Sequence, residues 1–559
     1  MRRPSTTRLL VLLLCVSAVV RLGLALRPGI WADEVFSLAM ATGHSLEQPA
    51  AESDPARGDF VEPSGVVPSG SFRRYAEHEA PPADAAKVIR AVFRSDTSPP
   101  LYYVLLNGWT RVFGTGDASL RLCSLVFTVL ALPLVWLLGR DLGGTRMAWT
   151  AAVLFAVSPV SVFYSVEGRM YSLLWLLAAG LAWTTLALSR RDARPALMAA
   201  WVALAAGGLL THYFFVFVWF AFVAWLLLVP GRLGRAVAIG LAAVSALAVA
   251  PWYVRVPESL ARWRVSGNWL ADPLHGAEWL TRPFELAWSL LAGGSFWGGS
   301  PLVDGGLALA WLLLALHLLR SGRLRNALGR EQLLLWLWVG AVVFGPLAFD
   351  LLRHTGASRV TRYVLAGLPG AMLLAALGIE QLRGRAHTAF VALVLLAWTA
   401  GLWPILAHRA RPGAAYPTLA AELSAWAGPD DLVLVHSIPS GVIGLSRYLR
   451  PDVPVASWIA PLGLRRVPDD LERLLQGRRR LALVQVHNLA EPAPAEPWLR
   501  EHSHLTRREL FDGALDVLTT DTAGLPPSQL AAMHEHKLIE VFYFDFAPAS
   551  GATLVPTRR

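Results

Sequence analysis

Long apolar runs recur along this sequence, and they constrain its fold more than any other feature. A helix needs about 20 mostly apolar residues to cross the hydrocarbon core of a bilayer. Runs of that order lie near residues 9–26, 120–138, 147–165, 170–188, 196–211, 213–229, 235–254, 302–319, 332–350, 361–380 and 386–406. Backbone groups in lipid must find their hydrogen bonds within the protein, and strands would show shorter alternating segments, so the runs predict helices. We therefore expect an α-helical polytopic membrane bundle of about 11 transmembrane helices.

The composition excludes several other classes of protein. With 55% hydrophobic and 16% charged residues, the chain is too apolar for an ordinary soluble domain. Its net charge of +10 does not indicate nucleic-acid binding, because the arginines lie in short clusters between the apolar runs. Cys15 and Cys123 each fall inside an apolar run, which leaves no disulfide framework and no thiolate metal site. The first run nears spanning length and lacks a clear small-residue cleavage site, so a retained helix is favoured over a cleaved signal peptide.

Arginines mark alternate connections between the apolar runs. The clusters lie at 2–8, 140–146, 190–194, 232–235, 320–330 and 383–385. By the positive-inside rule these connections are cytoplasmic, which predicts a cytoplasmic N-terminus in the plasma or inner membrane and an extracytoplasmic C-terminus. The alternation requires residues 101–113 to lie on the outer surface rather than to cross the bilayer.

The chain divides by composition near residue 410. Residues 1–409 form the predicted transmembrane domain, with a first outer loop at 27–119 and a Trp-rich outer loop at 255–301. The tryptophans of the second loop fit an interfacial aromatic belt, and sugar stacking is the alternative.

Residues 410–559 predict a different architecture. There the apolar runs shorten to strand length, and helix-like segments lie between them. The predicted strands are 432–435, 481–484 and 541–544, and the predicted helices are 418–426 and 470–475. Strands alternating with helices predict a small C-terminal α/β extracytoplasmic domain.

The acidic residues of the first outer loop are candidates for chemistry. Asp33 and Glu34 follow the outer end of the first run, where a carboxylate needs water or a polar site nearby. Asp33 would equally suit the N-cap of a surface helix. Asp96 precedes two prolines that predict an extended entry to the 101–113 segment, and its alternative interpretation is a loop acid.

Two further groups of polar residues lie at the outer ends of later runs. Glu167, Arg169 and Tyr171 occupy the junction of the third and fourth runs, where a short turn can also carry charges merely as interfacial residues. His212 ends the fifth run among aromatic residues, where a packed histidine is more usual than a metal ligand.

Arginines near the tenth run break the cytoplasmic pattern. Arg359, Arg362 and Tyr363 lie in and after the loop that precedes this run. Arginines kept on the outer side next to a span suit an anion, such as a phosphate held at headgroup depth.

Carboxylates, arginines and a membrane location together indicate group transfer from a lipid phosphate. When a glycosyl group leaves a polyprenyl phosphate, the enzyme must deprotonate the acceptor and neutralise the departing phosphate. Asp33 suits the first role, and Arg169 or Arg362 suits the second. The same inventory would serve other lipid-phosphate chemistry, so these residues alone do not single out sugars.

An ordered set of short motifs resembles the GT-C glycosyltransferases, specifically the branch of protein O-mannosyltransferases, aminoarabinose transferases and their bacterial relatives. The motifs are WADE (31–34), SPPLYY (98–103), LRL (120–122), YSVEGRMYS (164–172), THY (211–213), RY (362–363) and LP (368–369). They follow the family order between about residues 8 and 380. Two departures stand out: VEGR (166–169) replaces the usual QEAR, and a long insert separates Asp33 from Asp96.

The resemblance implies a polyprenyl-phosphate-linked monosaccharide donor and inverting transfer to an extracytoplasmic protein, lipid or glycan. Asp33, with Glu34 beside it, would be catalytic, and Asp33 would accept the proton of the acceptor. Asp96 and His212 would line the cavity, and a divalent metal ion at these positions is left open because some relatives resemble metal-binding proteins there. The residues that would bind the donor phosphate or sugar are Glu167, Arg169, Tyr171, Arg359, Arg362 and Tyr363.

Two functions of other classes remain as alternatives. A transporter or flippase of lipid-linked sugars would carry charges along its spans near the midplane and often shows inverted repeats. A non-catalytic polysaccharide-assembly membrane protein would use the outer acids only as surface caps.

Overall fold

The computed structural model describes ten stretches of the chain, which form two compact units. The stretches are residues 6–95, 98–190, 194–229, 231–265, 270–293, 300–323, 328–406, 415–486, 493–511 and 539–546. The first unit, here the helical unit, comprises Met1–Arg27, Asp96–Arg262 and Asn268–Ala410. The second, here the sheet unit, comprises Pro28–Ser95, Trp263–Gly267 and Arg411–Arg559.

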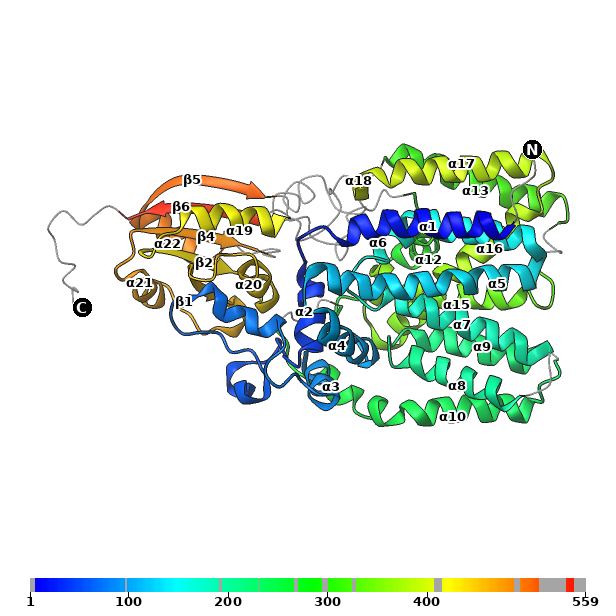
Figure 1. Cartoon of the computed structure of the whole chain (residues 1–559), viewed down its shortest axis with the longest axis horizontal. Helices are drawn as coiled ribbons and strands as arrows, with labels where there is room; N and C mark the ends of the chain where they lie inside the picture. Colours follow the sequence, from blue (N-terminus) through cyan, green and yellow to red (C-terminus); the bar gives the residue numbers. More distant parts are fainter. Residues whose placement is uncertain are drawn as a thin grey trace. The chain divides into compact units, whose positions relative to one another are not determined.

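Helices make up the helical unit (Figure 1). Its elements are α1 (Thr6–Ala25), α4 (Leu101–Phe113), α5 (Asp117–Val157), α6 (Pro159–Tyr164), α7 (Tyr171–Arg190), α8 (Pro195–Leu209), α9 (Phe215–Leu228), α10 (Arg235–Tyr253), α11 (Val256–Ala261), α12 (Glu278–Ser289), α13 (Pro301–Arg320), α15 (Leu333–Arg353), η5 (Ala357–Arg359), η6 (Thr361–Gly367), α16 (Leu368–Glu380), α17 (Arg385–Gly401) and α18 (Trp403–Leu406). Each of the eleven predicted apolar runs is mostly helical. The segment expected to lie on the surface forms α4, with the predicted bounds.

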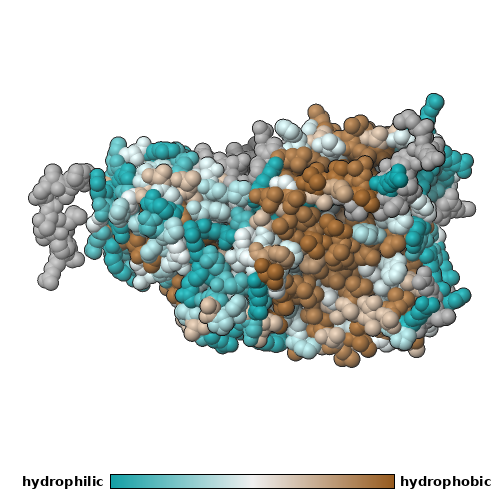
Figure 2. Space-filling model, in the orientation of Figure 1, coloured by the Kyte–Doolittle hydropathy of each residue, from teal (hydrophilic) through white to brown (hydrophobic). Residues whose placement is uncertain are grey.

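Six helical segments among the described residues are long and apolar enough to cross a membrane. They are Asp117–Val157, Tyr171–Arg190, Arg235–Ala261, Pro301–Arg320, Leu333–Arg353 and Thr361–Glu380. Shorter apolar helices lie at Cys15–Ala25, Pro195–Leu209, Phe215–Leu228 and Arg385–Gly401. Apolar side chains also cover much of the helical unit's surface on the face drawn in Figure 2. A surface of this kind is stable in lipid rather than in water, and the prediction of a polytopic helical membrane bundle is confirmed.

The long helix α5 is in fact two helices. Gly144 has φ 84° and ψ −179°, a backbone conformation open to glycine but not to other residues. A Cβ added at Gly139 would lie 2.7 Å from the Cα of Ala148, so the two halves pack backbone against backbone. The runs predicted at 120–138 and 147–165 are therefore separate helices joined at a glycine.

A mixed six-stranded sheet forms the centre of the sheet unit. Its strands are β1 (Val67–Pro68), β2 (Asp431–His436), β3 (Pro454–Trp458), β4 (Arg480–Gln485), β5 (His504–Phe511) and β6 (Ile539–Asp545). The order is β1-β3-β2-β4-β6-β5, in which β3, β2 and β4 are parallel and the outer pairs are antiparallel. The helices are α2 (Ala32–Ala41), η1 (Ala50–Glu52), η2 (Pro55–Arg57), η3 (Ser69–Ala76), α3 (Ala85–Ser95), α19 (Ala415–Trp426), α20 (Pro439–Ser446), η7 (Ala460–Leu462), α21 (Asp469–Leu475) and α22 (Ala495–His502).

The central strands are buried on both faces, as the continuous apolar runs predict. All six residues of β2 are buried. One face packs against α21 and α22 in a core that includes Leu434, Leu483, Phe542 and Leu499. The three predicted strands and two predicted helices of this region are confirmed as β2, β4, β6, α19 and α21.

The first outer loop contributes to this sheet, which differs from the predicted division at residue 410. β1 pairs with β3, and the backbone N–H of Ser69 donates to the carbonyl of Val453 at 2.9 Å. The carboxylate of Glu62 accepts a hydrogen bond from the N–H of Ile459 at 2.9 Å. Residues 28–95 therefore fold with the C-terminal region. A two-residue strand and isolated polar contacts leave no periodic signal in a sequence, so this association was not predictable.

Candidate active site

A short turn between α6 and α7 carries two buried charged residues. We call residues 165–170 the Glu-Arg turn. Glu167 is 3% exposed and Arg169 is 6% exposed, and the N–H of Arg169 donates to the carbonyl of Glu167 at 2.7 Å. Ionisable groups buried in a membrane protein are costly, and they usually mark a functional site.

Close packing leaves no room for a side chain at the centre of this turn unless a neighbour shifts. A Cβ added at Gly168 would lie 2.3 Å from the Cγ of Leu120, which is fully buried on α5. The packing therefore explains why Gly168 occupies the position before the arginine, where the family often has an alanine. The large side chain of Leu120 occupies the space that the alanine methyl would need.

Arg169 is held by residues of α4 and α5. Its Nη1 donates to the hydroxyl of Tyr103 at 3.0 Å. The hydroxyl of Ser124 donates to the Arg169 carbonyl at 3.2 Å and lies 3.3 Å from the hydroxyl of Tyr102. The motifs SPPLYY and YSVEGRMYS, far apart in the sequence, thus meet in the fold. Tyr103 was not among the predicted site residues, although its place in the motif SPPLYY was a usable signal.

The short helix η6 brings Arg362 and Tyr363 to the same group of helices. It packs against α7, α9, α12 and α15, and the indole N–H of Trp175 on α7 donates to the carbonyl of Leu365 at 2.8 Å. Arg362 is 6% exposed. The rings of Tyr363 and His212 have centroids 5.3 Å apart. Tyr171 begins α7, and Arg362 and Tyr363 lie on η6, which packs against α7. His212 lies in the turn between α8 and α9 and contacts Tyr363.

His212 presents limited means to hold a metal. Its Nδ1 accepts a hydrogen bond from the N–H of Phe214 at 3.2 Å, so this ring nitrogen is already engaged. Among the described residues no group of three or more His, Cys, Asp or Glu side chains could hold a metal ion. Asp96, the other predicted ligand, lies outside the described residues. His212 alone does not define a metal site, and a divalent ion held by Asp96 and His212 stays a prediction.

Arg359 is fully occupied by the Trp-rich loop. Its Nε and Nη2 donate to the two carboxylate oxygens of Glu278 at 3.0 and 2.9 Å. Its Nη1 donates to the carbonyl and the carboxylate of Asp272, and Nη2 also donates to the carbonyl of Pro273. The five N–H groups of a guanidinium are thereby all used. The Arg359 hydrogen bonds lower the pKa of Glu278 to about 2, so this pair is charged at neutral pH. Arg359 has no donor left for a phosphate.

The predicted catalytic acids lie on α2 of the sheet unit. Trp31 is the N-cap of this helix, so the alternative in which Asp33 is the N-cap is wrong, and Asp33 lies in the first turn instead. Glu34 contributes to the cap instead, because its carboxylate accepts a hydrogen bond from the N–H of Trp31 at 3.4 Å. Glu34 is 1% exposed, whereas Asp33 is partly exposed. Of the two acids, Asp33 has the more exposed side chain.

Comparisons with known proteins agree with this architecture. Residues 97–254, which include the Glu-Arg turn and His212, match the family model of dolichyl-phosphate-mannose-protein mannosyltransferase. No protein of curated function matches the chain in sequence. Crystal structures of ArnT from Cupriavidus metallidurans have the same fold over nearly the whole chain. The apo form has a TM-score of 0.54 at 14% identity and covers 96% of this chain and 98% of ArnT. The form bound to undecaprenyl phosphate has a TM-score of 0.53 at 13% identity and covers 96% of this chain and 97% of ArnT. The resemblance predicted from the motifs is therefore confirmed: the chain has the fold of ArnT, and residues 97–254 carry the sequence pattern of the dolichyl-phosphate-mannose-protein mannosyltransferase family.

Proposed function

We propose that this protein is a membrane glycosyltransferase that transfers a monosaccharide from a polyprenyl-phosphate donor to an extracytoplasmic acceptor. The main support is the buried Glu-Arg turn, in which Arg169 is held by Tyr103 within the segment that matches the mannosyltransferase family. The ArnT structure with undecaprenyl phosphate shows that this fold can bind a polyprenyl phosphate. Two buried arginines suit such a phosphate, because a guanidinium always carries its charge and matches phosphate geometry.

The proposed reaction is a single displacement at the anomeric carbon of the donor sugar. The acceptor oxygen attacks this carbon, the bond from the carbon to the phosphate oxygen breaks, and the configuration inverts. Asp33 takes the proton of the acceptor, and the bonding electrons leave with the phosphate. Arg169 and Arg362 neutralise the departing anion, while Glu167 and Tyr103 orient Arg169.

We assign other roles to three predicted site residues. Arg359 fastens the Trp-rich loop to η5 through Glu278 and Asp272. Glu34 contributes to the N-terminus of α2. Tyr171 lies 5.1 Å from Tyr164 between ring centroids and packs the first turn of α7. A divalent metal near Asp96 and His212 stays a prediction, and no step above uses one.

The arginine distribution supports the proposed orientation. The N-terminus would be cytoplasmic, and the sheet unit would lie on the outer side of the plasma or inner membrane. This side is where a protein, lipid or glycan acceptor of the cell envelope is available.

The decisive experiment uses purified full-length protein with a panel of polyprenyl-phosphate sugars. We expect one donor to be consumed and its sugar transferred. Asp33→Asn should stay folded and lose transfer by about a hundredfold or more, in line with the contribution of a general base of roughly 10²–10⁴. Glu77→Gln is a matched control, because Glu77 is an exposed acid of the same unit.

The outcomes separate the alternatives. Retained turnover in Asp33→Asn rejects Asp33 as the base. If no donor in the panel is consumed by the wild-type protein, the glycosyltransferase proposal fails. Movement of an intact lipid-linked sugar across the membrane of proteoliposomes, without sugar transfer, would instead indicate a flippase. If the protein shows neither transfer nor movement, the remaining alternative is a non-catalytic assembly role.

A further inference from the structure

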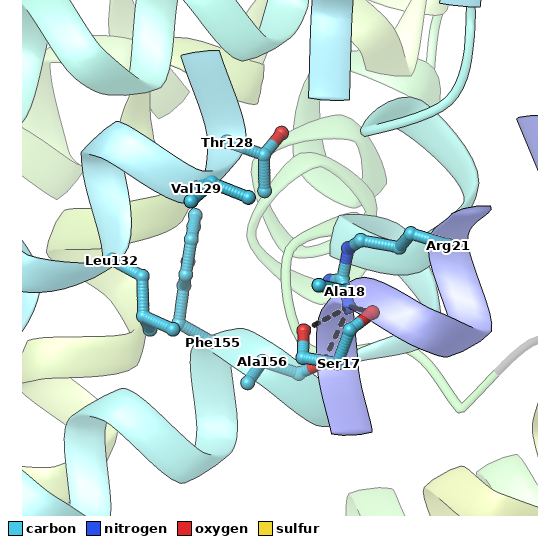
Figure 3. A pocket seen from close by; sticks show the side chains of 8 residues that line it. All are labelled: Ser17, Ala18, Arg21, Thr128, Val129, Leu132, Phe155 and Ala156. Carbon is cyan, nitrogen blue, oxygen red and sulfur yellow. Dashed lines mark hydrogen bonds between the residues drawn. The ribbon is translucent and has the colours of Figure 1, made fainter. Parts of the chain in front are cut away.

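A buried arginine on the first membrane helix contacts the segment that leads into the Glu-Arg turn. Arg21 on α1 is 2% exposed. Its Nε donates to the hydroxyl of Ser165 and its Nη2 to the hydroxyl of Ser161, both at 2.9 Å. Its Nη1 donates to the hydroxyl of Ser17 at 2.5 Å and to the carbonyl of Ala156 at 3.1 Å (Figure 3). One guanidinium thus ties α1 to the end of α5, to α6 and to the first residue of the turn.

The partners of Arg21 are neutral oxygens. Among the described residues no carboxylate forms an ion pair with it. A charged group inside a membrane helix is costly, and an apolar side chain would fill the same space without that cost. Simple stabilisation is therefore a poor reason for an arginine here.

The pocket beside Arg21 does not suit an anion. It lies between α1 and α5 and is lined mainly by apolar groups, including Val129, Leu132 and Phe155 (Figure 3). Four of the five N–H groups of Arg21 point at oxygens of the described residues. The guanidinium is directed at the backbone and the serines rather than into the pocket.

Ser161 and Ser165 connect Arg21 to the Glu-Arg turn. Ser161 lies on α6 and Ser165 follows it by one helical turn, so the two hydroxyls lie on the same face. The hydroxyl of Ser165 also donates to the carbonyl of Val162 at 2.8 Å. The planar guanidinium holds both hydroxyls at once and so sets the rotation of α6. Glu167 comes two residues after Ser165, and any rotation of α6 would move it.

We propose that Arg21 is a positioning residue that fixes the Glu-Arg turn for donor binding. The proposal rests on the proposed function for the role of the turn, but the order of the turn can be measured without any substrate. The fork geometry of the guanidinium is what matters, because a lysine ammonium is a single point that cannot span both serines in the same way.

The test compares Arg21→Met with the wild-type protein by two measurements on full-length protein in detergent. Amide hydrogen exchange over residues 159–170 should become at least about tenfold faster, with no change in the interior of α7. Binding of undecaprenyl phosphate should weaken about tenfold, since misplacement of a binding group by about 1 Å can cost up to a hundredfold. Arg21→Lys should recover only part of either loss.

Two further variants keep the proposal testable if Arg21→Met fails to fold. The double variant Ser161→Ala, Ser165→Ala removes the two hydrogen bonds from Arg21 to α6 and the turn and keeps those to Ser17 and Ala156. It should reproduce both changes, with no additional loss when it is combined with Arg21→Lys. Arg27→Met is the matched control, because Arg27 also lies near the end of α1 but donates to the carbonyls of Ile405 and Leu406 at 3.2 and 2.5 Å. It should leave the exchange of residues 159–170 unchanged.

Each outcome decides between the explanations. Unchanged exchange in both the Arg21 and the serine variants overturns the proposal. Full recovery by Arg21→Lys also overturns it, because charge alone would then be sufficient. If the wild-type protein neither binds undecaprenyl phosphate nor transfers a sugar, the proposed function fails, while the exchange measurement still decides whether Arg21 orders the turn.

Discussion

Substituting Gly168 by alanine tests whether the Glu-Arg turn can move. The added methyl carbon would lie 2.3 Å from Cγ and 2.5 Å from Cδ2 of Leu120. Carbon atoms pack at about 3.5–4.0 Å, and Leu120 is fully buried, so the strain must displace either the leucine or the turn. Overpacking of this kind costs roughly 1–3 kcal/mol. If the turn yields, kcat/KM for the donor should fall by about fivefold to a hundredfold.

A compensating substitution makes this prediction specific. Leu120→Ala removes the atoms that clash, although on its own it should destabilise the protein by about 2–5 kcal/mol. In the double variant the new methyl group occupies part of the vacated space. The combined loss in kcat/KM should therefore be smaller than the product of the two single losses, with a coupling of about 1 kcal/mol or more.

The assay is initial-rate kinetics over donor concentration, with thermal unfolding of the same purified proteins. Leu138→Ala is the control, because Leu138 is fully buried on the same helix but lies about 27 Å further along it. Its effect should simply add to that of Gly168→Ala. Wild-type kinetics and stability in Gly168→Ala, or an additive pair with Leu120→Ala, would refute the close packing on which the reasoning depends.

Three further predictions concern other contacts. Tyr103→Phe removes a hydrogen bond to the charged Arg169, worth about 1.5 kcal/mol or more, so thermal stability should fall, and because Arg169 is then less well oriented, donor binding should weaken by up to about tenfold in equilibrium titrations. Glu278→Gln breaks the ion pair with Arg359 and should speed limited proteolysis of residues 270–278. In the wild-type protein the same loosening should occur only at acid pH, because the Glu278 pKa falls from 4.5 in the unfolded chain to about 2, and its stabilisation is lost as the pH drops through that range. Burial lowers the pKa of His44 from 6.5 to about 4, so the sheet unit should lose up to about 3 kcal/mol between pH 6.5 and 4, and His44→Gln should flatten the pH dependence of thermal unfolding over that interval.

Hydrophobic length and turn composition were sufficient to predict most of the helical unit. Each apolar run became helical because a lipid environment leaves the backbone no other partner. The two helices that make up α5 were predicted as two separate runs, because Gly144 and the polar residues around it interrupt the apolar pattern. The buried strands β2, β4 and β6 were recognisable for a similar reason, since their apolar runs are short and continuous.

Side-chain partners were less predictable than the elements that carry them. Arg359 and Arg362 are three residues apart and look alike in the sequence. Arg359 finds Asp272 and Glu278 about 80 residues away, whereas Arg362 lies on a helix that packs against α7. Only the three-dimensional structure shows that Arg359 holds the Trp-rich loop, whereas Arg362 is a candidate phosphate ligand. The same holds for Arg21, whose apolar neighbours in the sequence give no indication of the two serines it contacts.

The pairing of β1 with β3 has a consequence for biosynthesis. Residues 28–95 leave the ribosome long before β2 and β3, which begin at Asp431 and Pro454. At a synthesis rate of about 5–20 residues per second, this early segment waits some tens of seconds for its partners. During that interval α2 lacks its contacts with α20, and the short strand β1 lacks its partner β3. Nascent chains of this protein should therefore depend on a chaperone, on early association with the membrane surface, or on both. This dependence should end once β2 and β3, in the last quarter of the polypeptide, have been made.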